Sequence, residues 1–197
     1  MNKIKKFRLS PRPSSVLKNL KALTGDAQST PELESAMETE MRRAVDLFAT
    51  AALYDTFDRG RTPESLAGFW EAPADAPAEP VALTLYAATI GTPLEEALGD
   101  ALSRGEALLS RVLTAVGEES AEQAAAFVTR LAAEQAAQEG CEVSPRREAP
   151  TPDVRRDVLS FLNSEKVGIV VDGAGHLSPR FTRVGGLLWY PPKKRRG

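Results

Sequence analysis

The segment Val81–Leu102, VALTLYAATIGTPLEEALGDAL, decides the fold class because a strand pattern in it is followed at once by a helix pattern. In its first half, apolar residues alternate, so that Val81, Leu83, Leu85 and Ala87 fall on one face. Alternation of this kind is typical of a strand with one face toward a core. We therefore expect a strand that ends just before the helix begins.

The helix start has a capping-box pattern. Thr92 is expected to be the N-cap residue, Pro93 occupies the first helical position, and Glu95 occupies the third. Glu95 and Glu96 then lie in the first turn, where carboxylates interact favourably with the helix dipole.

The helical pattern continues to Gly140, where a glycine is expected to end it. We predict a break near Gly117 and a restart on Glu118 and Glu119, which would again be first-turn carboxylates. Seven apolar residues are expected to face a sheet: Leu108, Leu109, Val112, Val116, Phe127, Val128 and Leu131.

The first seventy residues, 1–70, indicate a basic N-terminal segment followed by helices. SSVLKNLKAL (14–23) predicts a short helix before Gly25, and TPESLAGFW (62–70) predicts another. Between them, an amphipathic helix is predicted from an N-cap at Thr30 through Phe57, because apolar residues recur at spacings of three and four.

EAPADAPAEP (71–80) has three Pro and four Ala in ten residues, which predicts a linker or loop. It is the best candidate for a boundary before an α+β region over 81–192, although a loop within one domain is equally possible. The chain then closes with a basic tail, KKRRG (193–197).

The C-terminal part combines one helix with strands. CEVSPRREAPTP (141–152) is expected to be extended, and a short helix should follow with Thr151 as cap and Pro152 at its first position. Two strand-like runs come last, VGIVVD (167–172) and GGLLWY (185–190). This order of elements indicates an α+β fold rather than alternating βαβ units.

Composition excludes several classes of protein. A net charge of −2 gives no overall attraction to nucleic acid or to anionic lipid. With one Cys and one His, the chain has no internal disulfide framework, no Cys-cluster zinc site and no multi-His metal site. We find no secretory signal and no apolar run long enough to span a membrane, so a cytoplasmic location is the default expectation.

The motifs of common catalytic sites, such as GxSxG, GxxxxGK[ST], GxGxxG and HExxH, are absent from the sequence. Cys141 and His176 could form a nucleophilic pair only if the fold joins them, and we interpret them as a structural thiol and a loop residue. Arg146 and Arg147 precede a helix start and could bind a carboxylate or phosphate. A solvated loop with a local pair to Glu148 is the alternative, which the residues alone favour.

The second half of the chain resembles the activation domain of cobalamin-dependent methionine synthase over about residues 81–190. In that family a strand ends in a Thr-[Ile/Leu]-Gly turn before helices, and a Pro-containing loop, a short helix and a Ser/Thr-x-x-Gly strand follow. The matching features are Thr89-Ile90-Gly91, Phe161-Leu162, Gly168-Ile169, Leu177-Ser178-Pro179, Thr182, Gly185 and Trp189-Tyr190.

This resemblance implies a twisted antiparallel sheet flanked by helices. It also implies a function in which the chain binds S-adenosylmethionine and docks over the cobalamin of a corrinoid protein or methyltransferase. An electron from a reduced donor protein and the methyl group of S-adenosylmethionine would then restore methylcobalamin. Holding the two reactants together is the main task, so no catalytic acid, base or nucleophile is implied.

The resemblance places the ligand site in the loop 144–151 and the turn 173–183. Arg146 or Arg147 would pair with the carboxylate of S-adenosylmethionine, and the backbone of 173–179 would contact the rest. The implied site residues are Arg146, Arg147, Glu148, Gly173, Gly175, His176, Ser178 and Thr182.

Two other functions stay open. The family has Gly-Tyr where this chain has Arg146-Arg147, and this favours a module that docks on a corrinoid partner without binding S-adenosylmethionine. The basic N-terminus and KKRRG could contact nucleic acid, but no aromatic-basic platform for single strands is present. Nucleic acid is therefore the least favoured partner.

Overall fold

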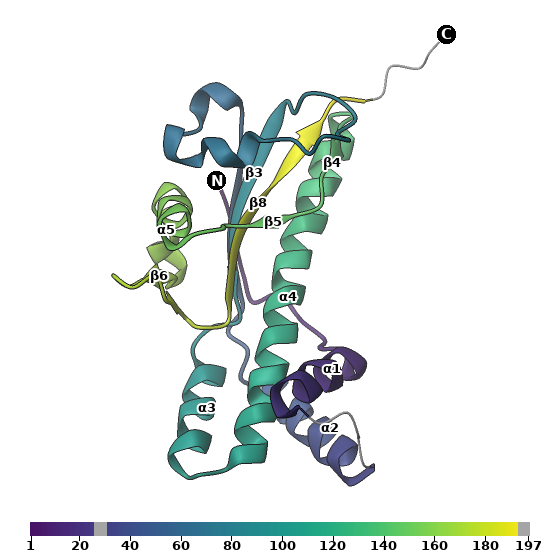
Figure 1. Cartoon of the computed structure of the whole chain (residues 1–197), viewed down its shortest axis with the longest axis vertical. Coiled ribbons are helices and arrows are strands. Elements are labelled where there is room, and N and C mark those ends of the chain that lie inside the picture. The colour runs from purple at the N-terminus through teal and green to yellow at the C-terminus, as the bar shows by residue number, and fades with distance from the viewer. Residues whose placement is uncertain (26–30, 193–197) are drawn as a thin grey trace.

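A computed structural model describes residues 1–25 and 31–192 of the chain, and it has the expected α+β architecture (Figure 1). The main sheet is antiparallel, and its strands, in spatial order, are β1 (Asn2–Lys5), β2 (Ala51–Phe57), β3 (Ala82–Thr89), β8 (Thr182–Tyr190) and β4 (Glu142–Val143). A further short strand, β5 (Arg147–Glu148), also pairs with β8, beside β4.

Helices cover both faces of this sheet. The longest, α4 (Ala107–Gln138), runs along one face, and α1 (Pro13–Thr24), α2 (Pro31–Val45) and α3 (Pro93–Ser103) pack against it (Figure 1). The opposite face carries α5 and short 3₁₀ helices. These elements are α5 (Pro152–Phe161), η1 (Arg59–Arg61), η2 (Glu64–Trp70) and η3 (Ser164–Val167).

The alternation in β3 separates two hydrophobic cores. Tyr86 and Ala88 face the core beneath α4, whereas Leu83, Leu85 and Ala87 face the core beneath α5 and η2. Because β3 is central and covered on both faces, seven of its eight residues are buried. The predicted strand and its alternation are confirmed.

The prediction of one helix through Phe57 is wrong. Helix α2 ends at Val45, and Ala51–Phe57 form β2, which pairs with β1 on one side and β3 on the other. The apolar spacing of this segment fits either structure, and hydrogen bonds to two neighbouring strands decide in favour of the strand. The expected cap at Thr30 lies outside the described residues.

The predicted break near Gly117 is also wrong, because α4 is continuous from Ala107 to Gln138. Gly117 is buried where the ring of Phe181 packs against the helix, so this glycine serves close packing and does not end the helix. Glu118 and Glu119 are therefore mid-helix residues. The end near Gly140 is confirmed by its left-handed φ of 72°.

Of the seven residues expected to face the sheet, Val112, Val116 and Val128 are buried in the core under α4. Leu108 is 48% exposed, so its assignment to the sheet-facing side is wrong. It lies in the first turn of α4, which extends beyond the sheet toward α3 (Figure 1).

Both helices start at the predicted residues, Pro93 and Pro152, but only one of the two predicted caps forms. Thr151 caps α5 as expected, because its side chain accepts a hydrogen bond from the Val154 N–H. Thr92 instead has helical backbone angles and makes no side-chain cap, so the predicted capping box is wrong. The carboxylate of Glu95 is used elsewhere, since it accepts a hydrogen bond from the backbone N–H of Arg180 at 2.8 Å.

The two C-terminal strand-like runs do not share a sheet. VGIVVD contributes β6 (Val170–Val171), which pairs with β7 (Leu177–Ser178) in a separate hairpin, while GGLLWY is the second half of β8. Residues 71–80 form neither helix nor strand, and the strands that flank them, β2 and β3, are direct neighbours. The KKRRG tail lies outside the described residues.

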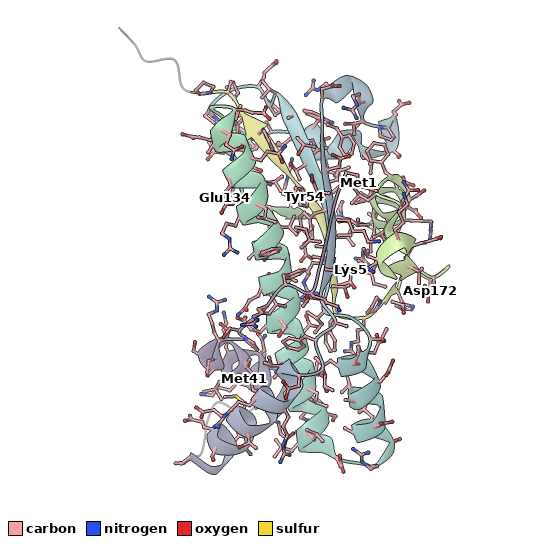
Figure 2. The ribbon with its side chains drawn as sticks, turned by 180° about the vertical axis from the view of Figure 1, so that it is seen from behind. Met1, Lys5, Met41, Tyr54, Glu134 and Asp172 are labelled. Carbon is pink, nitrogen blue, oxygen red and sulfur yellow. The ribbon has the colours of Figure 1, made fainter. Side chains whose placement is uncertain are left out.

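Two helices of the N-terminal part form where expected: SSVLKNLKAL lies within α1, and TPESLAGFW contains η2 as a 3₁₀ helix. Figure 2 shows the other side of the molecule, where the N-terminal strand runs along the edge of the sheet between Met1 and Lys5. Within residues 1–25 and 31–192, no helix combines the length and apolar character needed to cross a bilayer.

Candidate functional site

A cavity of about 540 Å³ lies where the start of β8 meets the β6–β7 hairpin, and we call it the β8 pocket. Four separate segments build it: the first turn of α3, the end of β5, the start of α5, and the chain from the hairpin into β8. The lining residues are Glu95, Glu148, Ala149, Arg155, Gly175, His176, Leu177, Arg180, Thr182, Arg183 and Val184.

The turn between β6 and β7 forms one wall. The Asp172 carboxylate accepts hydrogen bonds from the backbone N–H groups of His176 and Ala174, and it lies 3.0 Å from His176 Nδ1. These contacts with His176 and Ala174 hold the pKa of Asp172 below its usual value. Arg155 donates to the carbonyl of Gly175 at 2.9 Å and so fixes the turn to α5.

Gly175 is required at this turn for two reasons. Its φ is 87°, in the left-handed region that favours glycine. In addition, a β-carbon at this position would lie 2.4 Å from Cβ of Pro152. The backbone therefore lies directly on the first residue of α5, and the pocket wall depends on that contact.

The start of β8 forms the second wall. The Arg180 N–H donates to Glu95, and the Thr182 hydroxyl donates to the carbonyl of Pro179 at 2.6 Å. Thr89 at the end of β3 donates to the Phe181 carbonyl at 3.3 Å. The bond from Ser178 to Pro179 is cis. The backbone here is thus held by α3 and by β3.

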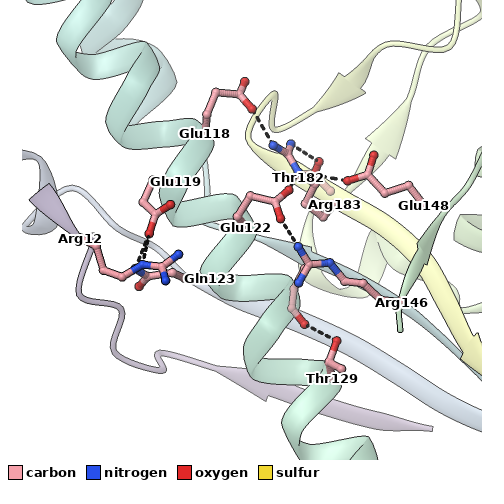
Figure 3. Close-up of polar contacts among 11 residues, drawn as sticks. Arg12, Glu118, Glu119, Glu122, Gln123, Thr129, Arg146, Glu148, Thr182 and Arg183 are labelled. Carbon is pink, nitrogen blue, oxygen red and sulfur yellow. Dashed lines mark hydrogen bonds and ion pairs between the residues drawn. The ribbon is translucent and has the colours of Figure 1, made fainter. Parts of the chain in front are cut away.

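Arg183 connects this wall to the middle of α4 through a set of ion pairs (Figure 3). Its Nε donates to Glu122 at 2.7 Å and its Nη2 donates to Glu118 at 2.6 Å, while Glu148 lies 3.5 Å away. Arg146 pairs with the same Glu122. We call these five residues the Arg183 cluster.

The Arg183 side chain is 17% exposed, so its charge depends on these partners. Burial lowers the pKa of Arg183, but the hydrogen bonds that it donates to Glu122 and Glu118 outweigh that effect, and the net shift is upward. Since both carboxylates already bind the guanidinium, Arg183 supplies a rigid wall and little free positive charge.

The predicted arginine pair is divided between the two faces of the sheet. Arg146 turns toward α4, whereas Arg147 donates to the backbone carbonyls of Phe69 and Glu71 on the other face. This follows from the alternation of side chains along an extended chain. The Arg147 backbone also lies on Gly185, where a β-carbon would come within 2.1 Å of its carbonyl oxygen.

Of the eight residues expected at the site, Glu148, Gly175, His176 and Thr182 line the β8 pocket. Arg146, Arg147, Gly173 and Ser178 do not line it. The pocket also includes Glu95 and Arg155, which lie outside the two predicted segments, and Arg180, which lies within the predicted turn 173–183 but was not named as a site residue. Arg183, the last residue of that turn, was also not named, although a charged residue in a largely apolar strand was a usable signal.

The pocket presents both signs of charge. Glu148 is 60% exposed and makes one long contact, to Arg183. The guanidinium of Arg180 lies 5.6 Å from the ring centre of Phe181 and has no ion pair within the described residues. This arrangement suits a zwitterionic ligand.

His176 is exposed, and no group of His, Cys, Asp and Glu among residues 1–25 and 31–192 could hold a metal ion.

Comparison with known proteins gives structural likenesses but no sequence match. No family model and no curated protein matches the sequence. A solved structure described as the crystal structure of the MetH reactivation domain bound to AdoHcy matches with a TM-score of 0.64 at 11% identity. The match covers 100% of this chain and 80% of that chain. At this identity it shows a common fold, which confirms the fold expected from the resemblance.

Proposed function

We propose that the chain binds S-adenosylmethionine in the β8 pocket and supports the reductive remethylation of cobalamin on a corrinoid protein or methyltransferase. The single observation that carries this is the fold: a reactivation-domain architecture over the whole chain, whose counterpart is described with AdoHcy bound. The position and charge of the β8 pocket give further support.

The ligand's groups have complementary partners in the pocket. An α-carboxylate would pair with Arg180, which lacks an ion pair within the described residues. The ammonium and sulfonium groups would lie toward Glu148, whose carboxylate is more than half exposed. Because the Arg183 cluster and the Asp172 turn are already fixed by hydrogen bonds, these walls need little ordering when a ligand binds.

The chemistry belongs to the ligand and to the cobalamin that the partner carries. One electron from a donor protein would reduce the partner's cobalt, whose electron pair would then form the bond to the methyl group, while the sulfur would keep the pair of the broken S–C bond and become a thioether. The chain's own contribution is to hold the sulfonium methyl close to the cofactor, so the rate gain comes from proximity.

Calorimetry with S-adenosylmethionine and S-adenosylhomocysteine tests the proposal. We expect the wild-type chain to bind with an affinity between micromolar and millimolar. Arg180→Ala should bind about tenfold or more weakly, because it removes a charge-assisted hydrogen bond to the ligand. Arg104→Ala is the matched control, because Arg104 is an exposed arginine directly after α3 that pairs with Glu106. Absence of binding to the wild-type chain would sink this proposal.

A docking module that does not bind S-adenosylmethionine is the second candidate. It is favoured by one observation: Arg146 and Arg147 are both engaged within the chain, by Glu122 and by the carbonyls of Phe69 and Glu71. This candidate predicts a complex with a purified corrinoid protein whose stability is the same with and without S-adenosylmethionine. Analytical ultracentrifugation of the two proteins distinguishes the candidates.

A further inference from the structure

A second cavity, of about 680 Å³, lies at the opposite end of β1 from Met1, and we call it the basic groove. Its walls come from the end of β1 and the segment that follows, from the connection between α2 and β2, and from Val167 of η3. Phe7, Leu9, Val45 and Phe48 make much of this lining apolar.

The charge of the groove has one sign. Its eleven lining residues include Lys5, Lys6 and Arg8 and contain no Asp or Glu. All three cations are exposed and have no ion pair within the described residues, unlike Arg12, which pairs with Glu119. Residues 1–25 as a whole contain seven Lys or Arg and no acidic residue, although the complete chain has a net charge of −2. Within the groove lining, no acidic residue compensates the charge of Lys5, Lys6 and Arg8.

The groove is held in shape by the backbone. Lys6 donates its N–H to the Thr50 carbonyl at 2.9 Å, and the Thr50 hydroxyl donates to the Phe7 carbonyl at 2.7 Å. The Phe7 ring stacks on Phe127 of α4 with 4.4 Å between centroids. Lys6 has a φ of 59°, a left-handed conformation that is unfavourable for lysine. These contacts keep the three cations around the groove before any partner binds.

Strand β1 adds a second recognition element. It is the terminal strand of the main sheet, and within residues 1–25 and 31–192 its outer edge pairs with no other strand. Lys5 belongs both to this strand and to the lining of the groove. An extended segment that adds to such an edge gains main-chain hydrogen bonds, and alternate side chains of the added segment then reach the neighbouring groove.

We propose that the basic groove and the edge of β1 together form a docking site for an extended acidic segment of a partner protein, with apolar residues between its carboxylates. Carboxylates would pair with Lys5, Lys6 and Arg8, and apolar side chains would enter the groove. This site is separate from the β8 pocket, and its existence does not depend on binding of S-adenosylmethionine.

Other occupants fit less well. A second copy of the chain that pairs through β1 would bring its own Lys3 and Lys5 against the same residues, so like charges would oppose it. A single-stranded nucleic acid needs a free aromatic face for its bases, but Phe7 is already stacked on Phe127, and Phe48, the other aromatic of the lining, packs against the core beneath α4. An acidic polypeptide satisfies the charge, the apolar lining and the open strand edge together.

The test uses the full chain and a fluorescein-labelled peptide of alternating Glu and Val residues, measured by anisotropy. We expect binding that weakens with salt, and at least tenfold weaker binding of the matched Gln–Val peptide. The variant that combines Lys5→Gln with Arg8→Gln should bind the Glu–Val peptide about tenfold or more weakly than wild type. Lys18→Gln combined with Arg111→Gln is the matched control, since these exposed cations lie outside the groove.

Backbone amide shifts of residues 5–9 and 49–51 in NMR spectra should change on titration with the Glu–Val peptide, which would locate the contact directly. The proposal is overturned if the groove variant and the control variant bind the peptide equally. It is also overturned if an oligonucleotide of equal charge, or vesicles of anionic lipid, bind more tightly than the peptide at physiological salt. Titration of S-adenosylmethionine into the groove variant should match wild type, so the two proposals fail independently.

Discussion

The ring of Phe181 lies against Gly117, in the space that a side chain on this helical residue would fill: a β-carbon there would be 2.4 Å from ring atoms Cε1 and Cζ. The contact joins the residue just before β8 to the middle of α4. Because Thr182 and Arg183 of the β8 pocket come next in the chain, this glycine helps to set the position of the pocket wall.

Gly117→Ala should therefore destabilise the fold. Overpacking of a filled core costs about 1–3 kcal/mol, which exceeds the gain of about 1 kcal/mol that alanine gives over glycine inside a helix. Contacts as short as 2.4 Å place this variant in the upper part of the overpacking range, at about 2–3 kcal/mol, so we expect a net loss of about 1–2 kcal/mol, measured by urea unfolding. Gly99→Ala on α3 is the control, because nothing lies within 4 Å of a β-carbon there. Equal stability changes in the two variants would contradict this account.

Arg183→Met is expected to be more damaging than a change in any exposed arginine. It would leave Glu118 and Glu122 without their shared guanidinium, and loss of one partner from a buried ion pair costs about 3–5 kcal/mol. Partial exposure of both carboxylates brings the expected loss to about 2–3 kcal/mol. The measurement is the free energy of unfolding from urea titration.

The control for Arg183 is Arg104→Met, which removes an exposed pair with Glu106 and should leave the unfolding curve unchanged. Glu122→Gln tests the same cluster from the other side, since Glu122 pairs with both Arg183 and Arg146. If Arg183→Met were as stable as wild type, the cluster would not hold β8 to α4.

Glu119 gives a prediction about pH. Its side chain is 5% exposed and accepts hydrogen bonds at 2.9 Å from Arg12 and from Gln123. Burial raises the pKa of Glu119, but the hydrogen bonds from Arg12 and Gln123 together lower it by a larger amount, so the net shift is downward. A lowered pKa in the folded state means that ionised Glu119 stabilises the fold above the pKa of the unfolded chain, about 4.3. This stabilisation disappears as pH falls through the folded-state pKa.

Glu119→Gln should thus cost about 1–2 kcal/mol at pH 7, and its difference from wild type should shrink below about pH 4. Urea unfolding at several pH values between 7 and 3 measures the difference. A constant difference over this whole range would show that the charge of Glu119 does not contribute.

The sequence predicted β3, the end of α4 and the cap of α5 because each is set by local signals: alternation, a glycine and a Thr-Pro start. It failed where a distant segment decides the structure. The segment 51–57 has apolar spacing that fits a helix, and only its pairing with β1 and β3 makes it a strand. Gly117 was similarly interpreted as a break because its partner, Phe181, is 64 residues away in sequence.

The site shows the same limit. Gly175, His176 and Thr182 were expected from the resemblance, and they line the β8 pocket. Arg155 and Glu95 were missed because each reaches the pocket from another helix, through contacts with Gly175 and Arg180. Such contacts depend on packing between elements, which local patterns do not encode.

Gly175→Ala is expected to alter the β8 pocket while leaving most of the fold intact. Alanine at a φ of 87° is strained, and its β-carbon would lie 2.4 Å from Pro152, so the turn must move away from α5. That movement breaks the hydrogen bond from Arg155 to the carbonyl of residue 175. We expect affinity for S-adenosylmethionine to fall at least tenfold in calorimetry, which corresponds to a loss of about 1.4 kcal/mol of binding free energy.

Gly173→Ala is the matched control in the same turn, because its φ is not left-handed and nothing lies within 4 Å of a β-carbon there. It should bind like wild type. Thermal unfolding should change by only a few degrees in either variant, since the turn lies outside both hydrophobic cores. Equal affinities of Gly175→Ala and Gly173→Ala would show that the ligand does not use this wall, and would move the binding site away from the β6–β7 turn.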